Sequence, residues 1–192
     1  MENKQKVIAG IIFVIVVVVA VYFGVIGNKN NQVGNVGQSN NANVKEEEKT
    51  VGEVIAPNAS PIKEGQVVTP TGKPADNSAV PGSENAPAQS VPLAKEEVPP
   101  TAIKLEISTD SGFKPNTFTV KAKSAVTLSL TGTDDQVHVL RFDDPSLNAV
   151  AIGLGPKMTR LINFNAPQEP GEYTFHDDVP GHQNLTGKMI VK

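Results

Sequence analysis

The residues with the most evident chemistry in this chain are its three histidines, His138, His176 and His182. All three follow Thr101, and the chain contains no Cys. Imidazole rings bind divalent metal ions and exchange protons near neutral pH. The absence of Cys excludes disulfides, thiolate zinc sites, a thiol nucleophile and a lipidated Cys as a membrane anchor.

The other nucleophilic side chains do not form a recognisable catalytic pattern. Serines of the C-terminal half lie in strand or turn patterns without a neighbouring histidine: Ser108, Ser111, Ser124, Ser129 and Ser146. A Gly-rich phosphate-binding loop is also absent from the sequence. We therefore assign no catalytic residue and expect a binding domain rather than an enzyme.

Alternation along one segment predicts a buried carboxylate. Tyr173, Phe175 and Asp177 are two residues apart, so in a strand they point to the same face. The two aromatic residues mark that face as the core face. A buried carboxylate costs several kcal/mol unless it is paired, hydrogen-bonded or bound to a metal ion. Asp177 therefore either has such a partner or begins a solvated turn, and His176 is expected on the outer face.

The elements that position these residues are predicted to be β-strands. Short segments separated by turn signals have the pattern of strands: residues 103–108, 118–121, 126–131, 137–142, 160–164, 173–176 and 188–192. Most alternate between apolar and polar residues, whereas residues 137–142 are almost continuously apolar, as in a central strand that is buried on both faces. This pattern predicts an all-β Greek-key sandwich of about seven strands within residues 101–192. The stretch 143–156 is expected to be a long loop. Two pairs of neighbouring carboxylates are expected in turns: Asp134 with Asp135, and Asp143 with Asp144.

The N-terminal part predicts a membrane anchor. Residues 7–27 carry no charge and are almost all apolar, which is long enough to cross a bilayer as one helix. A cleaved signal peptide, whose apolar part is shorter, is the competing interpretation. Lys4 and Lys6 precede the span and only Lys29 follows closely, so residues 1–6 are expected in the cytoplasm. The C-terminal domain would then lie outside a prokaryotic-type plasma membrane, as a single-pass protein whose anchor contacts the lipid bilayer.

Residues 28–100 predict a disordered tether between anchor and domain. They contain no aromatic residue, nine of the fifteen prolines and many Asn, Gln and Glu residues. Such a composition buries too little apolar surface to offset the entropy of ordering. The alternative is that residues 51–55 and 62–68 form short strands with a partner. Residues 101–192 hold nine Lys and Arg against ten Asp and Glu, without a basic stripe, so no nucleic-acid partner is expected.

Two stretches of the C-terminal part resemble a known family. The first is GFKPNTFTVKAKSAVTLSLTGTDDQVHVLRF, residues 112–142, and the second is PGEYTFHDDVPGHQNLTGKMIVK, residues 170–192. They resemble the two halves of a cupredoxin, in particular the divergent cupredoxin-like domains linked to bacterial iron uptake. The resemblance covers about residues 101–192 and implies the cupredoxin fold.

The resemblance also implies a set of metal ligands. Cupredoxins bind copper with two His, one Cys and a weak axial Met. The first His matches His138 and the second matches His182, whereas the Cys position falls on Asp177. The axial position falls on Leu185 or Thr186, which are weak or non-ligating residues.

The loss of the thiolate changes the expected chemistry. A blue-copper centre requires the copper–thiolate bond, so none is expected here. His138, Asp177 and His182 would form a two-His, one-carboxylate set suited to Cu(II), Zn(II) or Fe(II). His176 is a possible substitute ligand if the strand ends at Phe175.

These observations lead to two functional hypotheses. The first is a membrane-anchored extracytoplasmic domain that binds one copper ion, with zinc or iron as alternatives, at a remodelled non-blue site. The second is a metal-free cupredoxin-fold module for protein interaction in the cell envelope. Retention of His138 and His182 favours the first.

Overall fold

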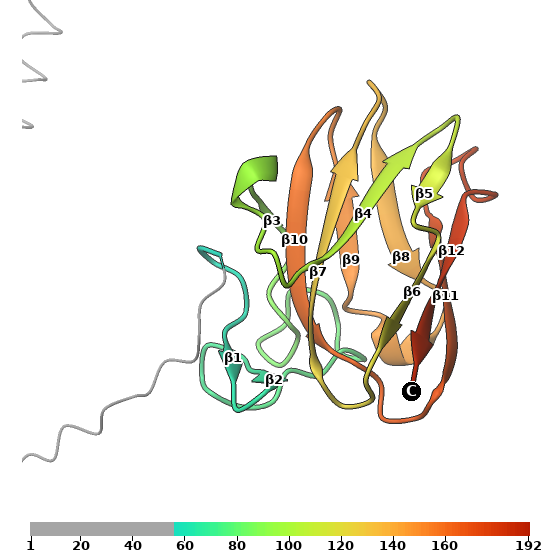
Figure 1. Ribbon diagram of the computed structural model, residues 1–192. Helices are drawn as coiled ribbons and strands as arrows, with labels where there is room; N and C mark the ends of the chain where they lie inside the picture. Colours follow the sequence, from blue (N-terminus) through green and yellow to red (C-terminus); the bar gives the residue numbers. More distant parts are fainter. Residues whose placement is uncertain (1–55) are drawn as a thin grey trace, which may run out of the picture. The chain divides into compact units, whose positions relative to one another are not determined.

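The computed structural model describes residues 56–192 (Figure 1). The expected cytoplasmic end 1–6, the expected anchor 7–27 and the first part of the tether, 28–55, lie outside these residues. Between residues 56 and 192 no helix has both the length and the apolar character needed to cross a membrane.

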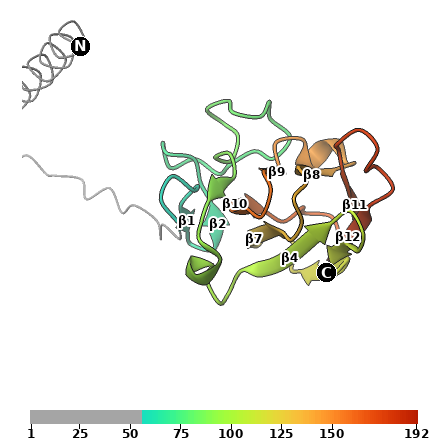
Figure 2. The same ribbon diagram turned by 90° about the horizontal axis from the view of Figure 1, so that it is seen from above.

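Two five-stranded sheets pack face to face as a β-sandwich (Figures 1 and 2). The first sheet has the order β3-β10-β7-β4-β5, with bounds Val91–Pro92, Thr159–Asn165, Ala125–Gly132, Ile103–Ser108 and Gly112–Lys114. The second has the order β6-β12-β11-β8-β9, with bounds Thr117–Val120, Thr186–Val191, Gly171–Asp177, His138–Phe142 and Ala151–Leu154. Neighbours are antiparallel except β4 with β7 and β6 with β12, which are parallel. The predicted all-β sandwich is confirmed.

The core lies between the sheets and is built from the alternating apolar positions. Phe175 of β11 is fully buried and contacts the rings of Phe113, Phe118 and Phe142, which come from three other strands. The ring centroids of Phe113 and Phe175 are 4.9 Å apart, in an edge-to-face arrangement that aromatic pairs favour. This packing fixes the inner face of β11, and with it the direction in which Asp177 points.

Some strands differ from the prediction. The stretch 143–156 was expected to be a loop, but Ala151–Leu154 forms strand β9, which pairs with β8. The same stretch holds one 3₁₀ turn, Pro145–Leu147. β5 was not predicted either. Both strands contain a glycine, Gly112 in β5 and Gly153 in β9, which in the sequence indicates a turn. Pairing with β4 and β8 forms these strands.

The structure also corrects the expected extent of the tether. Residues 56–100, termed the docked segment below, are ordered and packed on the sandwich, so the prediction of disorder up to residue 100 was wrong for this part. It contains the short hairpin β1 (Ile62–Lys63) with β2 (Gln66–Val67), strand β3 and a 3₁₀ turn, Lys95–Glu97. In both views the docked segment lies beside β10 (Figures 1 and 2).

Side-chain amides of β10 explain why this polar segment is ordered. Asn165 accepts a hydrogen bond from Val67 N (2.7 Å) and donates to Val67 O (3.0 Å), as a paired strand residue would. Asn163 donates to Ser60 O at 2.8 Å. Leu161 packs in a small second cluster with apolar residues of the docked segment and is fully buried. The short strands that the sequence allowed within residues 62–68 are therefore present as β1 and β2. The partner, β10, is not revealed by the composition of this segment.

Candidate metal centre

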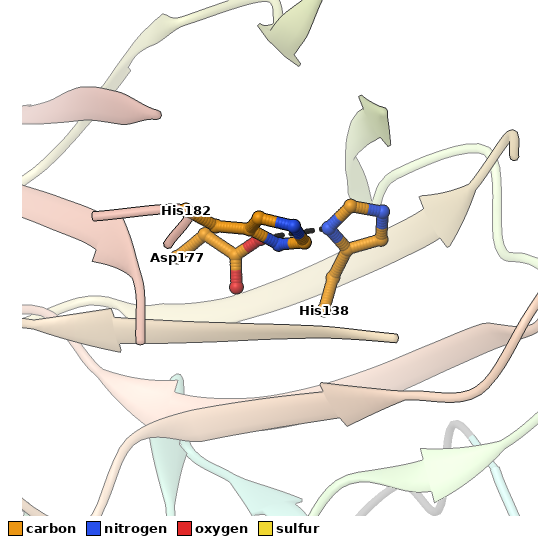
Figure 3. A group of neighbouring side chains, drawn as sticks. All are labelled: His138, Asp177 and His182. Atoms are coloured by element: carbon orange, nitrogen blue, oxygen red, sulfur yellow. Dashed lines mark hydrogen bonds and ion pairs between the residues drawn. The ribbon is translucent and has the colours of Figure 1, made fainter. Parts of the chain in front are cut away.

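Two strands of the second sheet and one loop bring the candidate ligands to one end of the sandwich. His138 is the first residue of β8 and Asp177 is the last residue of β11. β8 and β11 are antiparallel, with Asp177 opposite Leu140, so these two strand ends lie side by side. His182 lies in the loop that joins β11 to β12. Figure 3 shows the three side chains meeting.

The Asp177 carboxylate is the centre of the group. Its Oδ2 lies 2.7 Å from Nδ1 of His138 and 3.0 Å from Nδ1 of His182. Each residue offers one ligand atom, and these three atoms lie within 4.8 Å of one another. The structure therefore brings together the three residues that the family resemblance pointed to.

Burial and backbone hydrogen bonds fix this carboxylate. Asp177 and His138 are both 0% exposed, so the burial that alternation predicts for Asp177 is confirmed. Oδ1 of Asp177 accepts from Val139 N at 2.8 Å and from Val179 N at 3.3 Å. Asp177 thus has a buried histidine partner and two backbone N–H donors, one in strand β8 and one in the loop after β11, and it does not begin a solvated turn.

A second carboxylate contacts the far side of the His138 ring. Nε2 of His138 lies 2.9 Å from Oδ1 of Asp134. Oδ2 of Asp134 accepts from the backbone N–H (2.8 Å) and the hydroxyl (2.9 Å) of Thr109. Asp134 was predicted to be only a turn carboxylate. Its position four residues before His138 is the one sequence signal that points to this contact.

The environment raises the pKa of His138. Burial, the largest influence, favours the neutral ring and by itself lowers the pKa. The hydrogen bonds and negative charges of Asp177 and Asp134 together outweigh burial and raise it above 6.5. For Asp134, burial raises the pKa, but the hydrogen bonds from Thr109, His138 and Gln136 lower it well below 3.8. The metal-free centre therefore favours a protonated His138 between two carboxylates.

His182 forms the outer side of the group. Its side chain is 19% exposed, whereas that of His138 is fully buried. The loop is held by hydrogen bonds from His182 N to Val179 O (2.9 Å) and from Leu185 N to His182 O (2.8 Å). Gly181 adopts a left-handed φ of 91°, which glycine accommodates without strain. The loop thus presents one ring edge to solvent and Nδ1 to Asp177.

The remaining predicted candidates lie elsewhere. β11 continues through Asp177, so His176 keeps the opposite orientation and hydrogen-bonds to Asp143 (2.6 Å) on the outer face. It is not part of the group, and the possibility of a substitute ligand is corrected. Leu185 packs against the main core and Thr186 is exposed. Neither supplies a strong ligand.

The donor atoms fit a divalent metal ion with a small adjustment. Two ligands of one tetrahedral ion, bound at about 2.0–2.1 Å, lie about 3.3 Å apart. The separations of 2.7 and 3.0 Å in the structure are hydrogen-bond distances, so the ring protons now occupy the space between the donors. Binding would require loss of these protons and a widening of these two separations by a few tenths of an ångström. Two imidazole nitrogens and one carboxylate oxygen suit Cu(II), Zn(II) and Fe(II).

Comparisons with known proteins agree with the fold. The sequence model of the cupredoxin-like domain family matches residues 85–191. No curated protein sequence matches the chain.

Two solved structures are similar to this chain at low sequence identity. One is the reduced Cu(I) form, at pH 4, of an amicyanin mutant, with 23% identity, 53% of this chain and 92% of that chain covered, and a TM-score of 0.41. The other is dithionite-reduced auracyanin from the photosynthetic bacterium Roseiflexus castenholzii, with 22% identity, 48% and 97% covered, and a TM-score of 0.42. Likenesses of this size support no statement about the site.

Proposed function

The chain belongs to the family of cupredoxin-like domains, and we propose that its domain binds one copper-type metal ion at a non-blue site. The observation that supports this most directly is the convergence of His138 Nδ1, His182 Nδ1 and Asp177 Oδ2. Because the chain has no Cys, the thiolate of a blue-copper centre is absent.

Each residue has a distinct part in this proposal. His138 and His182 would bind the ion through Nδ1, and Asp177 would supply the anionic oxygen. A bound copper ion would add a one-electron couple, whereas zinc would add a Lewis acid only. The backbone N–H groups of Val139 and Val179 hold Asp177 in place, and the exposed edge of His182 leaves the centre accessible from solvent.

A metal-free interaction module is the competing function, and one observation favours it. Two buried side-chain atoms of residues 56–192 lack a hydrogen-bond partner, the Oδ1 atoms of Asn77 and Asn163, and neither belongs to the centre. The group of His138, Asp177 and His182 is thus satisfied without an ion. Metal binding must displace these hydrogen bonds.

The cellular setting is proposed from the sequence. Residues 7–27 would anchor the chain in the lipid bilayer of a prokaryotic-type plasma membrane, because this stretch is uncharged and almost entirely apolar. The domain would then lie on the outer side, where a protein of the cell envelope is a further proposed partner. No nucleic-acid partner is proposed, since charges of both signs are mixed along the chain.

Calorimetric titration of the full chain in detergent with Cu(II) and with Zn(II) tests the function. We expect one ion per chain and, for copper, an EPR spectrum with nitrogen ligands and no blue absorption. His182→Ala should lower the affinity by at least the roughly 10-fold seen when outer-shell partners are lost. His176→Ala is the matched control and should leave the affinity unchanged. Equal metal affinities and stoichiometries for the native chain and the His182→Ala variant would favour the metal-free module.

A further inference from the structure

Asp134 is held more firmly than an ordinary turn residue. Oδ1 accepts from His138 Nε2 and from Gln136 N, and Oδ2 accepts from Thr109 N and its hydroxyl. Thr109 directly follows β4 of the first sheet, and His138 begins β8 of the second sheet. Asp134 therefore connects the two sheets at this end of the sandwich, and its oxygens cannot turn away from the histidine without losing other hydrogen bonds.

This contact decides which nitrogen of His138 faces the centre. With Nε2 donating its proton to Asp134, Nδ1 is the nitrogen left to bind an ion beside Asp177 and His182. A carboxylate that accepts the second ring N–H orients a ligating histidine and makes it a stronger donor. His138 is fully buried, so this effect acts in a poorly solvated environment.

The two carboxylates also set the charge of the centre. Asp177 and Asp134 contribute two negative charges around His138, which a divalent ion balances. A Cu(I) ion balances only one of these charges, so the buried environment of His138 and Asp177 favours a divalent ion over Cu(I). The three candidate ligands also offer no sulfur, the donor that Cu(I) prefers.

We propose, on the basis of the metal site proposed above, that Asp134 is a positioning residue that makes the centre selective for divalent ions over Cu(I). It acts through His138 and does not itself contact the ion. The neighbouring Asp135 supplies an internal comparison. Its side chain is 78% exposed and pairs with Lys157 Nζ at 2.9 Å, away from the histidine.

The test compares the full chain with Asp134→Asn and with Asp135→Asn as the control for loss of one charge. Affinities for Cu(II), Zn(II) and Cu(I) are measured by competition with chelators, and the potential of the copper-loaded chain is measured with redox mediators. Asp134→Asn should weaken Cu(II) and Zn(II) binding roughly 10–100-fold. The Cu(I) affinity should fall by a factor at least 10 times smaller than the Cu(II) affinity does. The reduction potential should therefore rise by at least about 59 mV. Asp135→Asn should change neither quantity.

The outcomes separate this inference from the proposed function. If the native chain binds none of the ions, the metal site and the role of Asp134 are both overturned. If the native chain binds and both variants have its potential, the role of Asp134 alone is overturned. Should Asp134→Asn fail to fold, ¹⁵N NMR of the histidines in the zinc-loaded native chain decides. A hydrogen-bonded Nε2–H on His138 with Nδ1 bound to zinc supports the inference, and zinc on Nε2 overturns it.

Discussion

Asp177 occupies the position where a thiolate is expected from the family pattern, and its contacts show what a carboxylate does there. It accepts hydrogen bonds from two backbone N–H groups and lies against Nδ1 of both His138 and His182. A carboxylate can satisfy four donors at once, whereas a thiolate is a weak acceptor. A carboxylate at this position therefore gives a centre that is hydrogen-bonded without an ion. In the proposed function, an ion would replace the protons that lie between the donor atoms.

Replacing Asp177 should lower stability sharply. Asp177→Asn keeps the shape but removes the negative charge beside the buried His138, so we expect a loss of about 3 kcal/mol in the free energy of unfolding. Urea denaturation of the metal-free chain at about pH 6 measures it. Asp178→Asn, an exposed neighbour that pairs with Arg141, should have a much smaller effect. Similar losses in both variants would show that the buried ion pair contributes little.

The same residues predict how stability depends on pH. The pKa of His138 is raised in the folded state, so its contribution is complete below 6.5 and is lost as pH rises through the folded pKa. The pKa of Asp134 is lowered, so its contribution is present above 3.8 and is lost as pH falls. The metal-free chain should therefore be most stable at about pH 4–6.5 and weaken above that window.

Denaturation midpoints across this range test the prediction, and Asp134→Asn provides the control. The variant loses one of the two charges that raise the pKa of His138, so its stability should fall less steeply above pH 6.5. A native profile that instead rises through neutral pH would contradict a protonated His138. Metal affinity should show the opposite trend and increase with pH, because the ion competes with the Nδ1 proton.

At the level of elements, β10 has two roles. Its inner face contributes to the main core, whereas Leu161, Asn163 and Asn165 hold the docked segment on the other side. The side chain of Asn165 pairs with the backbone of Val67 through both its oxygen and its nitrogen. The side-chain amide of Asn165 thus bonds to Val67 as the backbone of a paired strand would. These bonds help to order a segment whose own sequence is poor in apolar residues.

Asn165→Ala should release part of the docked segment. The variant loses hydrogen bonds to Val67 N, Val67 O and Ala75 O, each of which contributes about 0.5–1.5 kcal/mol net. We expect a loss of about 2 kcal/mol together with faster proteolysis between residues 62 and 75. The exposed Gln168→Ala, three residues further on, should change neither. Equal proteolysis rates for the two variants would sink the idea that Asn165 orders this segment.

Replacement by alanine should have different effects on stability at two strand glycines. A Cβ on Gly187 of β12 would clash with the ring of Phe175 and lie 2.8 Å from Asn116 O, so Gly187→Ala should destabilise by about 1–3 kcal/mol. Gly153 of β9 has open space around its Cβ position, so Gly153→Ala should be neutral or slightly stabilising. Thermal unfolding of both variants tests the difference. Comparable losses would mean that the packing of Phe175 against β12 tolerates a methyl group.

At the level of the whole molecule, the folded unit is larger than the family pattern. The family match begins at residue 85, whereas the described structure begins at residue 56. Residues 56–84 add the β1–β2 hairpin and part of the second apolar cluster around Leu161. The docked segment is therefore a structural part of the domain and not a spacer that merely carries it.

Removing the docked segment should weaken the sandwich. A chain of residues 101–192 exposes Leu161, which is otherwise fully buried, and leaves Asn163 and Asn165 without their partners. Compared with residues 56–192, we expect a loss of at least about 2 kcal/mol, mostly from the exposure of the leucine. Calorimetric unfolding of the two chains measures it. A single, unchanged transition in the shorter chain would show that the sandwich is independent of this segment.

By itself the sequence determined the fold class, most of the sandwich strands and the burial of Asp177. These properties follow from the two-residue period of strands, which is local: Phe175 and Asp177 share a face because of their spacing alone. The family resemblance of the sequence also implied His138, Asp177 and His182 as the candidate ligands.

Only the tertiary structure decided what these residues contact. The pairing of β9 and the order of residues 56–100 depend on groups that meet across strands or across many residues. The bond from Asp134 to His138 spans only four residues, but Thr109, which follows a strand of the other sheet, holds Asp134 in place. The sequence does not show whether a polar side chain such as that of Asn165 will hydrogen-bond to water or to the backbone of another segment. Such contacts are fixed by the register between strands, which is set by packing of the whole core and not by any one segment.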